Sequence, residues 1–200
     1  MIRRAGEVDA GALALVVAEA FHDLPPARWL IPDPIERARV FPAYFRLLLD
    51  HAIALGEVHT VTGLAAVACW LDATGGRLRS PAGYDERLAE ACGPWVDRFR
   101  MFDLLLDHHH PPGPHHHLGL LATRPGHQRA GLGTALLDHH HRHLDRYAIP
   151  AYLEASSVRS RDLYLRHGYE QLVPIELPDG PPLWPMWRRP RLTPEDRSRR

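Results

Sequence analysis

One segment constrains this chain more than any other: an apolar strand, then a loop with glycines, then a helix. Residues 118–123 form an apolar run of strand length, and residues 131–147 have helical periodicity. Gly131 and Gly133 allow a ligand to approach the backbone closely. Free N–H groups and the positive dipole of the helix N-terminus then face that ligand. The segment therefore predicts an anion site suited to a pyrophosphate.

Two other interpretations of this loop are weaker. A dinucleotide-binding βαβ fold would need a third glycine, but Leu136 stands at that position and the N-terminal third is helical. The second alternative is a helix entry whose glycines serve packing only. The order of strand, loop and helix favours a ligand site over both.

The surrounding pattern alternates helices and strands. We expect helices at 8–21, with Asp9 as N-cap, at 35–55, 131–147 and 159–167, and a stretch at 85–107 broken by Gly93 and Pro94. We expect strands at 58–62, 64–71, 118–123, 151–155, 169–177 and 183–188, and a proline-broken loop at 23–34. This order predicts an α/β (α+β) sheet covered by helices, in one domain over 1–189. The tail 190–200 is expected to be disordered.

Composition excludes several classes of function. The chain contains no lysine, so it has no Walker A loop, no Schiff-base lysine and no kinase strand lysine. The formal net charge is +0, which gives no reason to expect a nucleic-acid partner. No apolar run approaches the roughly 20 residues of a membrane span, and no signal sequence is evident, so we expect a cytoplasmic protein. Cys69 and Cys92 are expected to be small buried hydrophobic residues.

The histidines are unusual in number and grouping. Nine of the 15 lie in runs at 108–110, 115–117 and 139–141. His139 and His143 are four apart on an expected helix, a spacing that can bind zinc. No neighbouring Glu or Cys completes a zinc motif, so we expect structural or solvated histidines and no native metal site. Metal storage by these runs stays an open alternative.

The sequence Gln128-Arg129-Ala130-Gly131-Leu132-Gly133 resembles the acetyl-CoA signature of the GNAT superfamily of N-acetyltransferases. The resemblance implies a GNAT fold, a mixed twisted sheet with helices on both faces, and acetyl-CoA as co-substrate. It implies that backbone groups of Leu121, Ala122 and Thr123 pair with the pantetheine arm. The residues implied to hold the pyrophosphate are Gln128, Arg129, Ala130, Gly131, Leu132, Gly133 and Thr134.

A second stretch, 152–169, resembles the strand, helix and terminal Gly-Tyr of the same family. Ser160 stands where many members carry Asn; its shorter side chain can still form a cofactor hydrogen bond. Tyr164 matches the general acid that protonates the leaving CoA thiolate, although a packed helix tyrosine is the alternative. Glu154 is a carboxylate in an apolar strand. It is expected either to accept the amine proton or to pair with an arginine.

Four further segments resemble the puromycin N-acetyltransferase branch: 20–23, 68–71, 150–156 and 178–186. That resemblance implies a small-molecule amine as acceptor. Its candidate contacts are Phe21, Asp23, Trp29, Tyr44 and Trp70, each of which could instead serve core packing. The alternatives are a protein or peptide N-acetyltransferase and a non-catalytic CoA-binding sensor. The chain is expected to be a monomer or homodimer.

Overall fold

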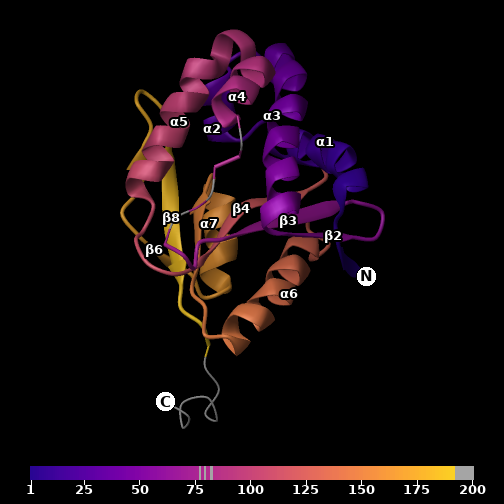
Figure 1. The fold of residues 1–200 in the computed structure, drawn as a ribbon, viewed down its shortest axis with the longest axis vertical. Helices are drawn as coiled ribbons and strands as arrows, with labels where there is room; N and C mark the ends of the chain where they lie inside the picture. Colours follow the sequence, from indigo (N-terminus) through magenta and orange to yellow (C-terminus); the bar gives the residue numbers. More distant parts are fainter. Residues whose placement is uncertain (77, 79, 82, 192–200) are drawn as a thin grey trace.

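A computed structural model describes residues 1–76, 78, 80–81 and 83–191. The helices are α1 (Ala10–Phe21), α2 (Pro25–Leu30), α3 (Pro34–Leu55), α4 (Tyr84–Cys92), α5 (Val96–His109), α6 (Leu132–Arg146) and α7 (Val158–Arg166), with short 3₁₀ turns at Glu7–Asp9 and Gly93–Trp95. The strands are β1 (Ile2–Arg4), β2 (Glu57–Val61), β3 (Ala66–Asp72), β4 (His116–Thr123), β5 (Ala151–Ala155), β6 (Glu170–Gln171), β7 (Ile175–Glu176) and β8 (Pro182–Arg188) (Figure 1).

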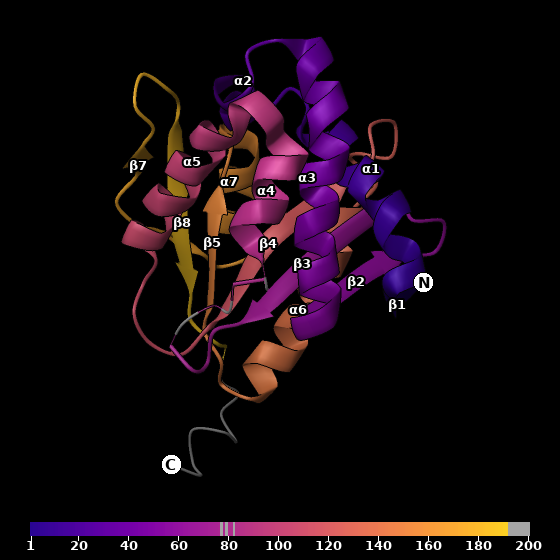
Figure 2. The ribbon, with the colours of Figure 1, turned by 45° about the horizontal axis from the view of Figure 1, so that its top comes forward.

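One mixed sheet organises the chain. Its strand order is β1-β2-β3-β4-β5-β8-β6, and β7 pairs with β8 beside this path. All described pairings are antiparallel except that of β4 with β5. Helices cover both faces of this sheet, so the predicted α/β architecture is confirmed (Figure 2).

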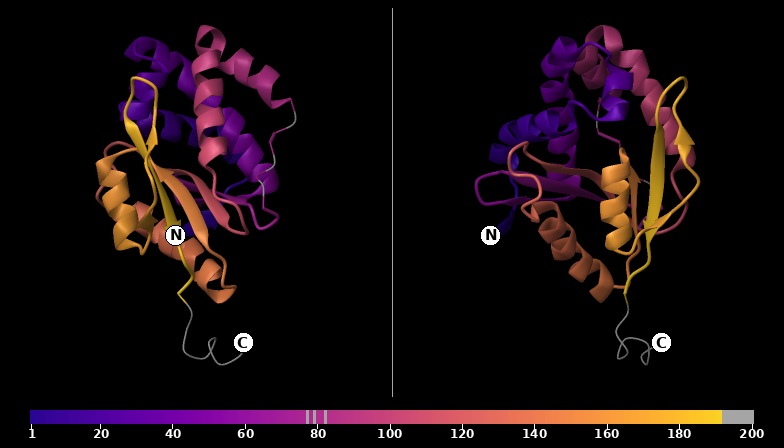
Figure 3. Two further views of the ribbon diagram at one scale, coloured as in Figure 1. Left: turned by 90° about the vertical axis from the view of Figure 1, so that its left-hand side faces the viewer. Right: turned by 180° about the vertical axis from the view of Figure 1, so that it is seen from behind.

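Each face of the sheet has its own apolar core. Helices α1, α3, α4 and α5 pack on one face, over side chains such as Val67 and Leu120. Helices α6 and α7 pack on the other face, over Trp70, Leu118 and Leu153. Figure 3 shows these layers edge-on and from behind. Burial of these two apolar sets supplies the main stabilisation, since each buried large side chain contributes about 1.5–3 kcal/mol.

Local signals fix the long helix α3 at both ends. The Asp33 side chain accepts hydrogen bonds from the amides of Ile35 and Glu36, and Pro34 occupies the first helical position. At the other end Gly56 is required by close packing, because a Cβ there would lie 2.2 Å from the Trp70 carbonyl oxygen. The glycine therefore allows α3 to turn directly into the sheet.

Two sequence predictions were wrong in detail, and a third was right in position only. The expected loop at 23–34 contains α2, because prolines are tolerated in a first helical turn. The expected strand at 169–177 is divided into β6 and β7, and Pro174 between them has no N–H for a sheet hydrogen bond. Asp9 stands at the N-cap of α1 as expected, but its side chain does not cap that helix; it pairs with Arg3 and accepts from the Gly6 amide, which caps the preceding 3₁₀ turn.

The predicted disordered tail, 190–200, falls mostly on residues 192–200, which lie outside the described residues. Within the part of the chain that the structure describes, no helix has the length and apolarity to cross a membrane.

A buried ion pair joins α6 to the last strand. The Arg188 side chain is 2% exposed, and its Nη2 donates to Oδ2 of Asp145 at 2.8 Å. The other carboxylate oxygen accepts from the Arg191 amide at 2.7 Å. Burial opposes the charge of Asp145, but the hydrogen bonds from Arg188 and the Arg191 amide together outweigh it and lower the pKa of this carboxyl.

We expect Asp145→Ala to lower the free energy of unfolding by about 3 kcal/mol, because it leaves a buried guanidinium without its counter-charge. Asp162→Ala is the matched control: it breaks an exposed pair with Arg161 and should cost less than about 1 kcal/mol. Folding lowers the pKa of Asp145, so the stability that its ionised form contributes should be lost as the pH falls through the acidic range. Urea unfolding at neutral and acidic pH measures both effects; equal losses in the two variants would contradict the assignment.

Candidate active site

The site begins where β4 and β5 separate. These parallel strands pair only at His116 with Ala151 and at His117 with Tyr152. Beyond His117 no pairing between them is present in the described chain, so the strands diverge. The β4 backbone that follows is thereby left available to a ligand.

A β-bulge shapes the same stretch of β4. Adjacent residues Cys69 and Trp70 of β3 pair with Leu120 and Leu118, so Gly119 is the extra residue. The bulge reverses the alternation of the strand: His117 and Leu120 point to the α3 face, whereas Leu118 points to the α6 face. Gly119 itself is exposed in the cavity described next. Bulges of this kind often re-aim side chains beside functional sites.

A cavity of about 510 Å³ passes through the gap between β4 and β5. Its walls come from both faces of the sheet. One end is apolar and aromatic, with α1, α3 and α5 contributing; the other end is polar and lies at the start of α6 and α7. Lining residues that matter for the chemistry are Phe21, Tyr44, Phe45, Phe102, Asp103, Asp107, His117, Gly119, Leu121, Thr123, Gln128, Arg129, Glu154, Arg159, Ser160 and Tyr164.

Glu154 lies at the centre of this cavity wall and its side chain is only 10% exposed. Its Oε2 lies 2.9 Å from Nε2 of His117, on the neighbouring strand. Burial opposes the charge, but the His117 ring, with smaller contributions from the Tyr152 hydroxyl and His110, outweighs it, so the pKa of Glu154 lies below its usual range. The second oxygen, Oε1, and the Tyr152 hydroxyl have no hydrogen-bond partner among the described residues. The carboxylate is therefore ionised and retains a free acceptor atom.

Tyr164 faces the same cavity from α7. It is 7% exposed, and burial raises the pKa of its phenol above the ordinary value. Its ring centroid lies 5.7 Å from that of Tyr169, in an edge-on contact that orients it. At neutral pH this phenol holds its proton, as a proton donor must.

The first turn of α6 lacks a side-chain cap. Gly131 is the N-cap with φ +74, a conformation that favours glycine, and no side chain of the described chain caps the helix there. Around Gly133 the space is open, since a Cβ there would have a Leu121 methyl group as its nearest neighbour, at 3.9 Å. The helix N-terminus is thus exposed, and its N-cap lies two residues after Arg129, which lines the polar end of the cavity together with Arg159.

Side chains beside this turn are already connected to one another. Gln128 Nε2 donates to the Thr123 carbonyl at 3.4 Å, and Arg159 Nη1 donates to Gln128 Oε1 at 3.2 Å. Ser160 and Ser157 form a reciprocal capping pair at the start of α7. The Ser160 hydroxyl also donates to the Ser157 carbonyl at 2.9 Å, so this side chain is held locally.

The aromatic end of the cavity contains a buried carboxyl. Tyr84 donates its hydroxyl proton to Oδ2 of Asp103 at 2.8 Å. Burial raises the pKa of Asp103 to about 6, even though the Tyr84 bond acts in the opposite direction. Tyr44 lies nearby, with its ring 4.6 Å from that of Phe99. This end of the cavity therefore combines apolar ring faces with an anion.

Most of the sequence-predicted site residues meet at this cavity, but not all. Phe21, Tyr44, Leu121, Thr123, Gln128, Arg129, Glu154, Ser160 and Tyr164 line it. Ala122 points into the core under α1 and α3. Ala130, Gly131, Leu132, Gly133 and Thr134 lie in the exposed or partly exposed turn that begins α6.

Three candidate acceptor contacts lie elsewhere. Trp70 is 1% exposed and stacks on His140 at 4.2 Å, on the α6 face. Trp29 donates to the Pro178 carbonyl at 2.8 Å and packs against Phe102, where it fastens the β7–β8 turn. The Asp23 side chain is 71% exposed and pairs with Arg28. These placements give the three residues structural roles and remove them from the cavity wall.

Several cavity residues give little signal in the sequence. His117 was attributed to a run of structural histidines, and only strand pairing reveals that it faces Glu154. Asp103 sits in an amphipathic helix, where a carboxylate ordinarily marks the solvent face. Arg159 lies two residues after Ser157 and directly before Ser160 in the second GNAT-like stretch. Its positive charge at that place was the available signal that it could belong to the site.

Comparisons with known proteins agree with this geometry. A family model described as acetyltransferase (GNAT) domain matches residues 100–171. A Corynebacterium glutamicum structure, named histone acetyltransferase HPA2 and related acetyltransferase, is 26% identical with a TM-score of 0.72, covering 97% of this chain and 98% of that one. Arylalkylamine N-acetyltransferase 2 from Aedes aegypti is 12% identical with a TM-score of 0.60, covering 94% and 98%. The ribosomal-protein-S18-alanine N-acetyltransferase from Escherichia coli is 18% identical with a TM-score of 0.52, covering 98% and 97%.

These matches establish the GNAT fold for this chain and support an N-acetyltransferase. The two structures with lower identity bear on the fold alone. The resemblance to the puromycin branch stays a prediction.

We expect Asp103 to titrate near pH 6 in a ¹³C NMR titration of side-chain carboxyls, because burial raises its pKa to about 6. Tyr84→Phe removes the hydrogen bond that lowers this value, so the midpoint should move higher still. Asp85 is the internal control: hydrogen bonding to Arg100 lowers its pKa, and the substitution should leave it unchanged. An ordinary midpoint for Asp103, near that of an exposed aspartate, would refute its burial.

Proposed function

We propose that this protein transfers the acetyl group of acetyl-CoA to the primary amine of a small molecule with an aromatic or apolar body. One observation carries the proposal: the His117–Glu154 pair and Tyr164 line a single cavity, between an uncapped helix N-terminus and an aromatic pocket. A proton acceptor and a proton donor are therefore available on either side of one reacting centre.

The residues at the polar end fit acetyl-CoA. The amides of the first α6 turn are free of side-chain caps, and Arg129 and Arg159 supply positive charge for phosphate oxygens. After His117, the edge of β4 that faces β5 is unpaired and offers backbone hydrogen bonds to an extended amide-bearing arm. When bound, acetyl-CoA supplies an acetyl group activated as a thioester.

Each reacting residue has a defined task. Glu154 accepts a proton from the acceptor ammonium, directly or through a water, with its free Oε1. His117 holds the carboxylate in place through Oε2 and stabilises its charge in a buried setting. Backbone N–H groups at the Gly119 bulge stabilise the negative charge that develops on the carbonyl oxygen. Tyr164 donates its phenolic proton to the departing sulfur.

The acceptor end indicates the kind of amine. Rings of Phe21, Tyr44, Phe45 and Phe102 line it, and Asp103 lies among them. Aromatic faces and a carboxylate together suit a cationic amine carried on an apolar body. The finer proposal is an aminonucleoside or another antibiotic-like amine, as in the puromycin branch that the sequence resembles. The arylalkylamine enzyme of Aedes aegypti, which has the same fold, is named for small amines of this character.

A peptide acceptor is the second candidate. Its support is the naming of the Corynebacterium glutamicum structure as a histone acetyltransferase. Against it, α4 and α5 cover the acceptor end, and a peptide needs an open groove. Small amines are therefore the first candidate acceptors, and peptides the second.

We expect acetyl-CoA to release its thiol in the presence of one member of an amine panel: puromycin, other aminonucleosides, arylalkylamines, aminoglycosides, polyamines and short peptides. Tyr164→Phe should lower kcat by about a hundredfold or more while acetyl-CoA still raises the melting temperature. Glu154→Gln should have a comparable effect on kcat, because an amide cannot accept the proton.

Tyr147→Phe is the matched control, since that tyrosine is exposed at the end of α6 and outside the cavity lining. It should leave turnover unchanged. A chain that binds acetyl-CoA and turns over none of these amines would favour a CoA-binding sensor. A chain whose melting temperature does not respond to acetyl-CoA would refute the proposed function altogether.

The acceptor KM should depend on pH through Asp103. Its pKa of about 6 means that it is anionic above that pH and neutral below it, so KM for the amine should rise as the pH falls through 6. Asp103→Asn should raise KM by about tenfold at neutral pH, in line with the loss of a charged hydrogen bond, and should flatten this dependence. Asp97→Asn, an exposed change on the same helix, is the control. An unchanged KM profile in Asp103→Asn would exclude this carboxyl from acceptor binding.

A further inference from the structure

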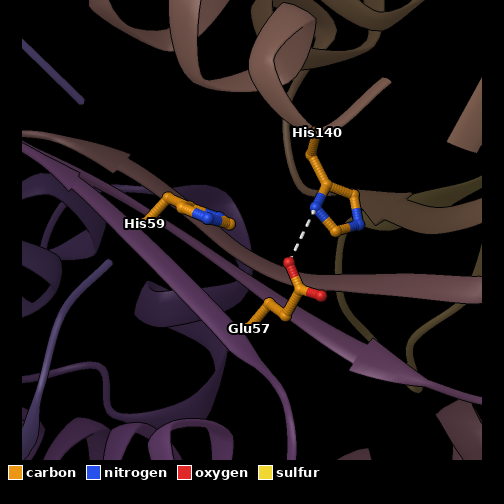
Figure 4. A group of neighbouring side chains, drawn as sticks. All are labelled: Glu57, His59 and His140. Atoms are coloured by element: carbon orange, nitrogen blue, oxygen red, sulfur yellow. Dashed lines mark ion pairs between the residues drawn. The ribbon is translucent and has the colours of Figure 1, made fainter. Parts of the chain in front are cut away.

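A group of potential metal ligands lies between the sheet and α6, away from the proposed active site. Glu57 and His59 are two apart on β2 and therefore point to the same face, and His140 reaches them from α6 (Figure 4). One ligand atom from each of the three lies within 4.8 Å of the other two. None of the three lines the proposed active-site cavity.

We propose that Glu57, His59 and His140 bind one divalent transition-metal ion, with Zn²⁺ as the best-fitting ion. Two imidazoles and a carboxylate are a ligand set that zinc accepts, with water completing the coordination. His140 Nδ1 and Glu57 Oε2 lie 3.6 Å apart. Zinc–ligand bonds of about 2 Å in a tetrahedron put ligand atoms about 3.4 Å apart, so this edge of the site is already formed.

The His140 ring is held for this role by two contacts. Its Nε2 lies 3.0 Å from Nδ1 of His116, and its ring stacks on Trp70 with an interplanar angle of 16°. In the tautomer with the proton on Nε2, His140 donates to His116, and its Nδ1, which faces Glu57 in Figure 4, keeps a lone pair for a metal ion. Metal-ligating histidines commonly donate their second ring nitrogen in this way, which fixes both tautomer and orientation.

His59 supplies an unsatisfied atom. Its Nδ1 is buried and has no hydrogen-bond partner among the described residues, and coordination to a metal ion would satisfy it. A bound ion gives the carboxylate of Glu57 a divalent cation as its partner.

A second group of this kind is a weaker candidate. Asp138, His141 and His167 also bring ligand atoms within 4.8 Å of one another. However, His141 Nε2 is already 3.0 Å from the Tyr169 hydroxyl, and the Asp138 side chain is 53% exposed. We therefore assign the metal to the Glu57 group. There it would fasten α6, whose first turn forms the proposed phosphate site, to β2.

The test is equilibrium binding of Zn²⁺ to the untagged full chain, by competition with a chelating dye, together with Co²⁺ absorption spectra and melting temperatures. We expect one specific ion per chain, a higher melting temperature with zinc, and the visible spectrum of four-coordinate Co²⁺. His59→Gln and Glu57→Gln should each weaken binding by about tenfold or more. Both change side chains that stand outside the apolar cores, so the folded state without metal should persist.

His167→Gln is the matched control because it removes a ligand of the second group and leaves the first intact. It should retain zinc binding and the cobalt spectrum. Zinc affinity that survives in His59→Gln and Glu57→Gln, or that is lost in His167→Gln alone, would overturn the assignment. Weak binding of several ions per chain with no cobalt spectrum, as the exposed histidines by themselves would give, would also overturn it.

Discussion

The separation of β4 from β5 is the constraint on which the rest of the site depends. Two parallel strands that pair at His116 and His117 and then diverge create a gap inside the sheet, where backbone groups are free and side chains from both faces can meet. The bulge at Gly119 acts at the same place, because it re-aims the strand as pairing ends. A continuously paired sheet would separate Tyr164, on the α7 face, from the aromatic pocket under α3.

The two apolar cores hold this gap open. Helices α1 and α3 are fixed to one face, and α6 and α7 to the other, so neither strand can move to restore pairing without uncovering apolar surface. The Asp145–Arg188 pair joins the end of α6 to β8, the strand that pairs with β5 on its other side. Rigid elements thus position the proposed reacting groups, which is what proton transfer over short distances requires.

Two carboxyl groups of the cavity have pKa values that are shifted in opposite directions. Glu154 has His117 beside it, so its pKa is held down and it stays ionised in an enclosed place. Asp103 accepts its hydrogen bond from a neutral phenol, so burial prevails and its pKa rises to about 6. The same carboxyl chemistry therefore suits the proposed proton acceptor, Glu154, at one point and the proposed titratable recognition group, Asp103, at another. Several histidines of the runs are also turned inward and do not face solvent. His117 contacts Glu154, His140 stacks on Trp70, and His141 contacts the Tyr169 hydroxyl.

The sequence by itself determined most of the order of elements, though not α2 or the division of 169–177, and the position of the glycine loop before α6. Glycines at 131 and 133 after an apolar run, and the segment 152–169, carried the GNAT fold, because such signals act over neighbouring residues through helix termini and strand periodicity. The sequence also pointed to Glu154 and Tyr164, whose proposed roles await experiment. Only the tertiary structure decided which side chains share a cavity. Trp70 and Ala122 turned to the cores, and Trp29 to the β7–β8 turn, whereas His117, Asp103 and Arg159 came to the cavity. That choice depends on strand pairing, on a one-residue bulge and on the packing of distant helices, which no local pattern of residues encodes.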